Sequence, residues 1–138
     1  MSSCVLDASA SLTWSIDVRK AAELDPIFAD IFEDGATVPI LWHTEILNGL
    51  LLAERAGRMT ADGVRVRMSQ FLNLPLTVDA DSPIRYRNEI VELARRHRLT
   101  AYDATYLELT MRAELPLATL DQALAAAARR EGVPLLIA

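Results

Sequence analysis

The sequence predicts an α/β fold in which a parallel β-sheet of four to five strands is flanked by helices on both faces. Short apolar runs alternate along the chain with longer segments of helical periodicity, a pattern typical of strand–helix–strand units with right-handed crossovers. The length of 138 residues suits one domain with its own core. No low-complexity tract, internal repeat or Gly/Ser/Pro-rich linker divides the chain, so we expect a single domain.

The strand predictions come from short apolar runs bounded by turn residues. The first run is Cys4-Val5-Leu6, and the second is Thr37-Val38-Pro39, shortly after Gly35. The remaining candidates are residues 76–78, residues 117–119 and, at the end of the chain, residues 134–137.

The helix predictions come from apolar periodicity and from residues that start or stop helices. Gly35 closes the second helix, and Gly57 is a C-cap for the third. Thr60 is an N-cap for the fourth, and Ser82-Pro83 supplies an N-cap followed by proline at the first helical position of the fifth. The predicted helices are residues 8–16, 21–33, 41–56, 60–72, from Ser82-Pro83 to about residue 97, 100–113 and 122–130.

Composition excludes several classes of protein. The single cysteine, Cys4, lies in an apolar run without an adjacent Lys, Arg or His, which predicts a reduced, buried thiol. One Cys and two His at unrelated spacings do not make a tetrahedral zinc site. We expect a cytoplasmic protein with no membrane partner, because we find neither a secretory leader nor an apolar stretch of membrane-spanning length.

Four acidic residues stand where a parallel sheet places ligand sites. Asp7 and Asp121 directly follow predicted strands, at the edge of the sheet where the connecting loops open. Glu45 and Asp103 fall in the first turns of predicted helices. Each also has an ordinary structural explanation. Asp7 and Asp121 are good N-caps, Asp103 follows Thr100 at capping-box spacing, and a helix dipole favours Glu45.

If these four carboxylates face one opening, they repel each other strongly. At ~5 Å and an effective dielectric near 20, each like-charge pair costs about 3 kcal/mol. Hard divalent cations with oxygen ligands would neutralise such a cluster. The formal net charge of −5 at first argues against a nucleic-acid partner, but two bound dications would add +4 and leave about −1.

The residues around the four acids resemble the PIN-domain family, and specifically the VapC-type toxins of bacterial toxin–antitoxin pairs. The similar stretches follow one another along essentially the whole chain. They are Val5-Leu6-Asp7-Ala8-Ser9; residues 39–50 with Glu45, Asn48 and Leu50; Leu99-Thr100-Ala101-Tyr102-Asp103-Ala104 followed by Tyr106-Leu107; and residues 117–124, with Thr119 two positions before Asp121. Many relatives carry a further acid shortly after the one matching Asp121, where this chain has Gln122, Ala123, Leu124 and Ala125.

The resemblance implies a metal-dependent endoribonuclease that hydrolyses RNA phosphodiester bonds with Mg²⁺ or Mn²⁺. It implies that the cation is held chiefly by Asp7, Asp103 and Asp121, with Glu45 acting as a further ligand or as a base. Candidates beside the ligands or on the phosphate side are Thr119, Ser9 and Asn48, for which turn, cap or helix-packing roles are the alternatives.

The resemblance also implies partners. VapC-type toxins receive a cognate antitoxin in a groove, and homodimers are common among them. The helices predicted at residues 41–56 and 60–72 carry more apolar residues than one face needs, and either a core or such a groove would account for them. These residues are Trp42, Ile46, Leu47, Leu50, Leu51, Met68 and Phe71.

Other classes of protein share parts of this pattern. A catalytically silent PIN-like binding module would keep the fold without cleaving RNA. A receiver-type phosphorylation module also gathers carboxylates at strand ends, but it needs a lysine late in the chain, and the only lysine is Lys20. Asp7-Ala8-Ser9 lacks the second acid of an Asp-x-Asp phosphatase. The basic run at residues 95–98 either meets RNA phosphates or is a solvated helix end.

Overall fold

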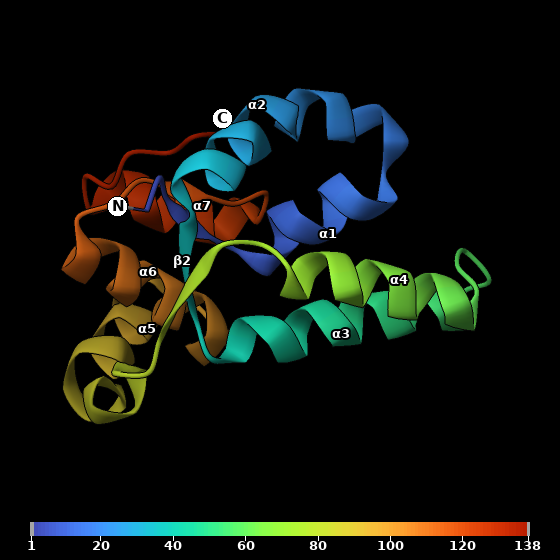
Figure 1. Ribbon diagram of the computed structural model, residues 1–138. Coiled ribbons are helices and arrows are strands. Elements are labelled where there is room, and N and C mark those ends of the chain that lie inside the picture. The colour runs from blue at the N-terminus through green and yellow to red at the C-terminus, as the bar shows by residue number, and fades with distance from the viewer. Residues whose placement is uncertain (1, 138) are drawn as a thin grey trace.

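A parallel sheet of four strands forms the centre of the computed structural model, which describes residues 2–137. The strands lie in the order β3-β2-β1-β4, and every neighbouring pair is parallel. Helices cover both faces of the sheet (Figure 1), which confirms the predicted α/β fold. The strands are β1 (Val5–Leu6), β2 (Ala36–Pro39), β3 (Leu76–Asp79) and β4 (Leu117–Ala118).

The last predicted strand, residues 134–137, does not form as a strand. Its contact with the sheet is an isolated parallel bridge between Leu135 and Leu117, in which the Leu117 amide donates to the Pro134 carbonyl at 2.9 Å. Pro134 has no N–H to extend a ladder. The sheet therefore has four strands, the lower end of the predicted range.

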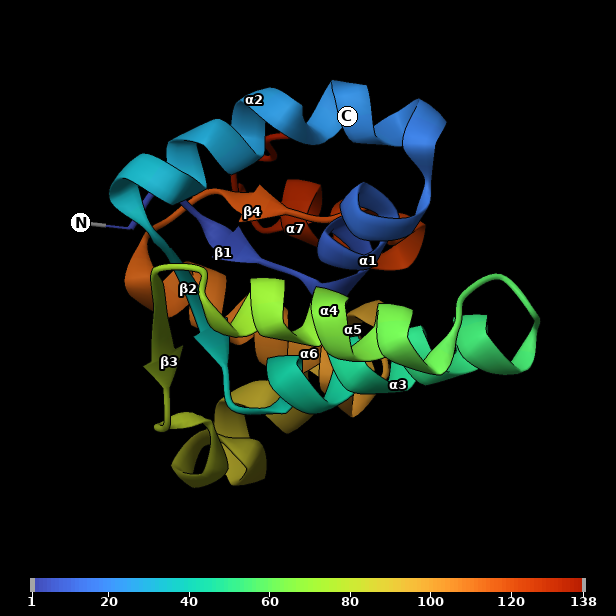
Figure 2. The ribbon, with the colours of Figure 1, turned by 45° about the vertical axis from the view of Figure 1, so that its right-hand side comes forward.

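Within residues 2–137 there are seven α-helices, one for each predicted helical segment. The second begins earlier than predicted, at Val18, because the Asp17 side chain accepts hydrogen bonds from the amides of Arg19 and Lys20. Figure 2 shows α3 and α4 as an antiparallel pair that extends beyond the strands. The helices are α1 (Ala8–Ile16), α2 (Val18–Asp34), α3 (Leu41–Arg55), α4 (Ala61–Leu72), α5 (Val91–His97), α6 (Ala101–Ala113) and α7 (Gln122–Arg130).

Most predicted helix ends are close to the observed ones. Thr60 is the N-cap of α4, and its hydroxyl accepts from the Gly63 amide at 3.0 Å. Gly35 ends α2 with a φ of 82°, a conformation that L side chains rarely adopt. At the end of α3 the prediction is one residue off, because Ala56 is the C-cap and Gly57 follows it with a φ of 74°.

The segment from Ser82 to residue 97 is helical throughout, as predicted, but it is not a single α-helix and Ser82 is not its cap. The segment forms a 3₁₀ turn (Ser82–Arg85), then a π-helical turn (Tyr86–Ile90), and only then α5. The buried Ser82 hydroxyl donates to Oδ2 of Asp79 at 3.3 Å instead of accepting from a helix amide. Asp79, three residues earlier, has therefore taken the hydroxyl that the sequence pattern assigned to a cap.

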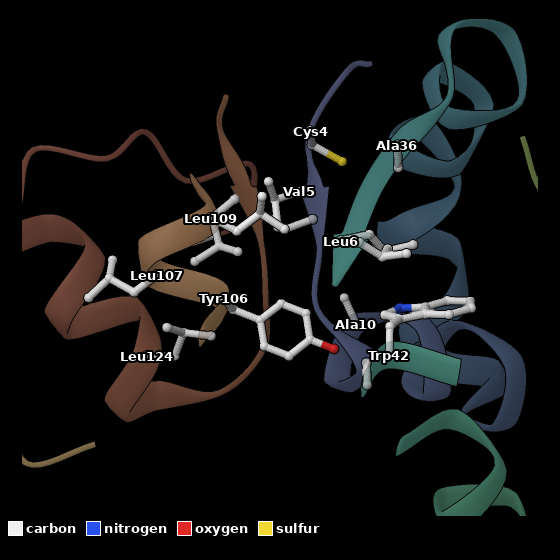
Figure 3. Close-up of a cluster of buried hydrophobic side chains, with 14 of the residues drawn as sticks. Cys4, Val5, Leu6, Ala10, Ala36, Trp42, Tyr106, Leu107, Leu109 and Leu124 are labelled. Atoms are coloured by element: carbon white, nitrogen blue, oxygen red, sulfur yellow. The ribbon is translucent and has the colours of Figure 1, made fainter. Parts of the chain in front are cut away.

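The core surrounds β1, whose side chains are completely buried together with those of neighbouring helices (Figure 3). The Cys4 thiol is free and buried, as predicted, and burial raises its pKa to about 11. Four of the apolar residues considered for a partner groove are also buried, namely Trp42, Ile46, Leu50 and Phe71. None of the helices within the described residues combines the length and apolar character that a membrane span requires.

Candidate functional site

The candidate site begins where β1 and β4 end side by side. Leu6 is in register with Ala118, and the Asp7 amide donates to the Ala118 carbonyl at 3.0 Å. The next residues, Asp7 and Thr119, therefore leave the sheet at the same edge. This is the carboxyl edge, where open parallel sheets bind ligands.

Two hydroxyl groups hold the carboxylate of Asp7. Ser9 Oγ donates to Oδ2 at 2.7 Å, and Thr119 Oγ1 donates to the same oxygen at 2.6 Å. Asp7 is buried and occupies the N-cap position of α1, yet its side chain makes no capping hydrogen bond to that helix. The N-cap explanation for Asp7 therefore does not hold. Oδ1 has no side-chain donor among the described residues.

The same hydroxyls also accept hydrogen bonds from the loop that carries Asp121. The Leu120 amide donates to Ser9 Oγ at 2.9 Å, and the Asp121 amide donates to Thr119 Oγ1 at 3.0 Å. The β1–α1 and β4–α7 connections are thus joined into one unit. The positions predicted for Ser9 and Thr119, beside an acid of the cluster, agree with the structure.

Asp121 caps α7, as one of its two interpretations predicted. Its Oδ1 accepts from the Leu124 amide at 2.9 Å. A cap uses one carboxylate oxygen, so this role leaves Oδ2 free of that bond. Capping and participation in a site are compatible for Asp121.

Asp103 lies in the first turn of α6, and the charges of the other three acids affect its pKa. Burial raises its pKa to about 7, and the negative charges of three other acids add to the effect, in the order Asp121, Asp7 and Glu45. The four predicted acids are therefore close enough to act on one another. Thr100 Oγ1 accepts from the Asp103 amide at 3.1 Å, which is one half of the predicted capping box.

The prediction that Glu45 lies in the first turn of its helix is wrong. The helix begins at Leu41, as predicted, but Glu45 is its fifth residue and lies just beyond the first turn, where a helix dipole acts most strongly. Burial raises the pKa of the Glu45 carboxyl, the Tyr106 hydrogen bond lowers it, and the charge of Asp7 raises it further. Tyr106 Oη donates to Oε1 of Glu45 at 2.7 Å.

Tyr106 also belongs to this region, although no role was predicted for it from the sequence. A signal existed, because Tyr106 follows Asp103 by three positions and so shares a face of α6 with it. For Asn48, the third predicted neighbour of the acids, a place beside the site stays a prediction. Its side chain is exposed, and no hydrogen bond links it to another residue in the part of the chain that the structure describes.

The donor set has the chemistry of a site for Mg²⁺ or Mn²⁺. It offers carboxylate and hydroxyl oxygens, the ligands that hard cations prefer, without sulfur or imidazole. Over residues 2–137, however, no three His, Cys, Asp or Glu side chains are placed to hold an ion as they stand. Mutual repulsion of the acids favours such an open arrangement until a counter-charge enters.

The two histidines and the basic run belong to other parts of the molecule. His43 packs edge-on against Trp42, with ring centroids 4.9 Å apart. The buried His97 lies 2.6 Å from Oε2 of Glu131, which Arg96 also contacts at 2.8 Å. Arg96 and His97 therefore tie the end of α5 to the end of α7, which favours the structural interpretation for these two residues.

Comparison with known proteins supports the fold. No family model matches the chain, and no curated protein matches it. Four solved chains match, and one of them is the crystal structure of PAE2754 from Pyrobaculum aerophilum. That chain is 27% identical in sequence, with a TM-score of 0.68 over 89% of this chain and 84% of PAE2754.

Proposed function

We propose that this chain is a Mg²⁺- or Mn²⁺-dependent endoribonuclease of the PIN-domain type, which hydrolyses phosphodiester bonds in RNA. The observation that carries the proposal is the parallel pairing of β1 with β4, which brings Asp7 and Thr119 to one edge of the sheet, where the hydroxyls of Ser9 and Thr119 donate to Asp7. Burial and the charges of Asp121, Asp7 and Glu45 also raise the pKa of Asp103 to about 7. Acids from four separate elements thus converge near the carboxyl edge of a parallel sheet. Clusters of carboxylates with perturbed pKa values are typical of functional sites.

The sequence motifs support the same proposal. Each of the four stretches that resemble the PIN-domain family contributes one acid to the cluster. Two of them also contribute Ser9 and Thr119, whose hydroxyls both donate to Asp7. The motifs give the residue types and their order along the chain, and the fold adds that these residues lie near one another.

The acids and hydroxyls of the candidate site would have different roles in RNA hydrolysis. A bound Mg²⁺ or Mn²⁺ would acidify water and offset the charge of the phosphate. Asp7, Asp103 and Asp121 would hold the cation, and the hydroxyls of Ser9 and Thr119 would keep the Asp7 carboxylate in one orientation. Because its pKa is raised to about 7, Asp103 would release a proton when the cation binds. Glu45 would ligate the cation or accept the proton of the attacking water.

On the resemblance to VapC-type toxins, we extend the proposal to biological context. The chain would be the toxin of a toxin–antitoxin pair, would act in the cytoplasm on RNA, and would bind a cognate antitoxin and a second copy of itself. Because Trp42, Ile46, Leu50 and Phe71 are core residues, a partner surface on α3 and α4 would have to use exposed residues. Apolar candidates there are Leu47, Leu52, Val66 and Leu72.

A second candidate function is a catalytically silent PIN-like binding module. It is favoured by the open arrangement of the acids, none of which stands with two others around one point within residues 2–137. Such a module would keep the fold and the hydroxyl–acid contacts and would lack RNA cleavage. The two candidates make opposite predictions in one experiment.

That experiment follows cleavage of a random-sequence RNA pool with Mn²⁺ or with EDTA. We expect the wild type to cleave only with the cation, and Asp7→Asn and Asp103→Asn to lose cleavage. Asp62→Asn is the matched control, since Asp62 lies on α4 with a side chain 92% exposed. A wild type that binds Mn²⁺ and leaves RNA intact would favour the binding module. Cleavage that persists in EDTA or in Asp103→Asn would overturn the proposed site.

A further inference from the structure

Tyr106 is completely buried, and its hydroxyl reaches out of its own helix. The ring extends from α6 toward the side of α1 and α3, with its oxygen at the tip near Ala10 (Figure 3). The hydroxyl donates to Oε1 of Glu45 at 2.7 Å, across 61 positions of sequence. The contact therefore connects α6, which carries Asp103, with α3, which carries Glu45.

Other buried hydroxyls on α6 behave differently. Thr105 donates to the Ala101 carbonyl at 2.7 Å, and Thr110 donates to the Tyr106 carbonyl at 2.7 Å. Both threonines satisfy their hydroxyls one turn back on the same helix, as hydroxyls that serve only the fold commonly do. Tyr106 instead contacts an acid of the candidate site.

We infer that Tyr106 is a positioning residue for Glu45. It engages Oε1 and fixes the carboxylate so that Oε2 faces the cation or the attacking water. This inference rests on the proposed function and assigns to Tyr106 a part in that same site. A buried tyrosine hydroxyl needs a hydrogen-bond partner, and a charged acceptor makes the bond stronger than a neutral one.

The direction of the hydrogen bond is fixed by the surroundings of Tyr106. Burial and the charges of Asp7 and Glu45 raise the pKa of the phenol, so it keeps its proton and acts as a donor. Oε1 of Glu45 is then the acceptor. One of its oxygens is engaged, and the orientation of the other is set by the plane of the carboxylate.

Tyr106→Phe tests the inference because it removes the hydroxyl and keeps the ring. We expect the variant to stay folded, kcat for RNA to fall about tenfold or more, and KM for RNA to stay within about twofold. The second readout needs no turnover. It is the Kd for Mn²⁺ by calorimetry, which we expect to rise about tenfold if Oε2 meets the cation and to stay unchanged if it meets the water.

The same substitution in a Glu45→Ala background separates positioning from a general structural role, because alanine removes the acceptor. If Tyr106 acts through Glu45, Tyr106→Phe adds no further loss of kcat or of Mn²⁺ affinity in that background. Tyr86→Phe is the matched control, since Tyr86 is 44% exposed and lies in the π-helical turn. Should Tyr106→Phe fail to fold, Tyr106→Met replaces it, because a flexible apolar chain also removes the donor.

Two results would overturn the inference while leaving the proposed function standing. One is a folded Tyr106→Phe with wild-type kcat and wild-type Kd for Mn²⁺. The other is an equal loss in the wild-type and Glu45→Ala backgrounds, which would make Tyr106 a structural residue. A wild type that neither binds Mn²⁺ nor cleaves RNA would overturn the proposed function and this inference with it.

Discussion

The Thr119 hydroxyl donates a hydrogen bond of 2.6 Å to Oδ2 of Asp7, across 112 positions of sequence. The bond exists because β1 and β4 are parallel neighbours, with Leu6 in register with Ala118. Both residues are buried, so the carboxylate depends on the protein rather than on water for its hydrogen bonds. The register of two short strands thus fixes the orientation of an acid in the candidate site.

Thr119→Val should weaken both the fold and the site. The substitution keeps the shape of the side chain, but it removes a donor from Asp7 and an acceptor from the Asp121 amide. We expect the free energy of unfolding to fall by about 2–3 kcal/mol and Mn²⁺ affinity to fall about tenfold. Urea denaturation and calorimetry measure the two effects.

Thr110→Val is the control for the loss of a buried threonine hydroxyl. Thr110 is equally buried on α6, and its hydroxyl donates to a carbonyl of the same helix. We expect it to cost about 1 kcal/mol and to leave Mn²⁺ affinity unchanged. Equal effects of Thr119→Val and Thr110→Val on Mn²⁺ affinity would show that the contact with Asp7 has no special role.

The raised pKa of Asp103 predicts that the metal-free protein loses stability as pH rises from about 4 to above 7. In this range the folded carboxyl, with a pKa of about 7, keeps a proton that the unfolded chain has released. The folded state therefore binds more protons, and raising the pH favours unfolding. A fully buried carboxyl with this pKa would change the free energy of unfolding by about 4 kcal/mol over this pH range. Because Asp103 is partly exposed, we expect a change of about 1–2 kcal/mol.

Urea denaturation in EDTA at about pH 5 and about pH 7.5 measures this difference. Asp103→Asn should remove most of it and should be at least as stable as the wild type at the higher pH, because a repulsive charge is gone. The exposed Asp62→Asn should keep the wild-type difference. If the wild type is as stable at the higher pH as at the lower one, the pKa of Asp103 is not raised as described.

Arg112 should be essential for stability, because it pairs with two poorly exposed acids. Its guanidinium donates to both carboxylate oxygens of Asp79 at 2.9 Å, and Nε donates to Oε2 of Glu108 at 3.0 Å. Arg112→Met leaves the Glu108 charge, whose side chain is 7% exposed, with Arg85 as its remaining cation at 3.8 Å. We expect a loss of about 3–5 kcal/mol in the free energy of unfolding.

Two further variants check the cause of that loss. Adding Glu108→Gln to Arg112→Met should restore part of the stability, since it removes the unpaired charge. Arg65→Met breaks only an exposed pair with Asp62 and should change the free energy of unfolding by about 0.5 kcal/mol or less. A loss from Arg112→Met no larger than that from Arg65→Met would contradict the proposed role of this ion cluster in the fold.

The sequence predicted the elements of the fold well, because their signals are local. Apolar periodicity located α1 and α7 with their observed bounds, and Thr60 marked the start of α4. The failure at Ser82 has a local part and a tertiary part. Ser82 looks like a cap in sequence, but its hydroxyl donates to Asp79, three residues earlier, and Arg112 of α6 donates to Asp79 across 33 positions. No local pattern reports the second contact.

The candidate site was predictable in its members but not in its geometry. The sequence named Asp7 both as a member of the site and as an N-cap. Only the pairing of β1 with β4 brings the Thr119 hydroxyl to the Asp7 carboxylate. The contact between Tyr106 and Glu45 likewise depends on two helices that meet across 61 positions. Residue type is visible in a sequence, whereas the partner of a buried polar group is a property of the fold.

Cation binding by the acidic cluster is measured by titrating the EDTA-treated protein with Mn²⁺ in a calorimeter. We predict that the wild type binds Mn²⁺ and that Asp7→Asn and Asp103→Asn bind at least about tenfold more weakly, while both stay folded and no less stable than the metal-free wild type. Asp62→Asn should bind as the wild type does. A wild type without Mn²⁺ binding, or variants that bind as tightly as the wild type, would contradict the proposal.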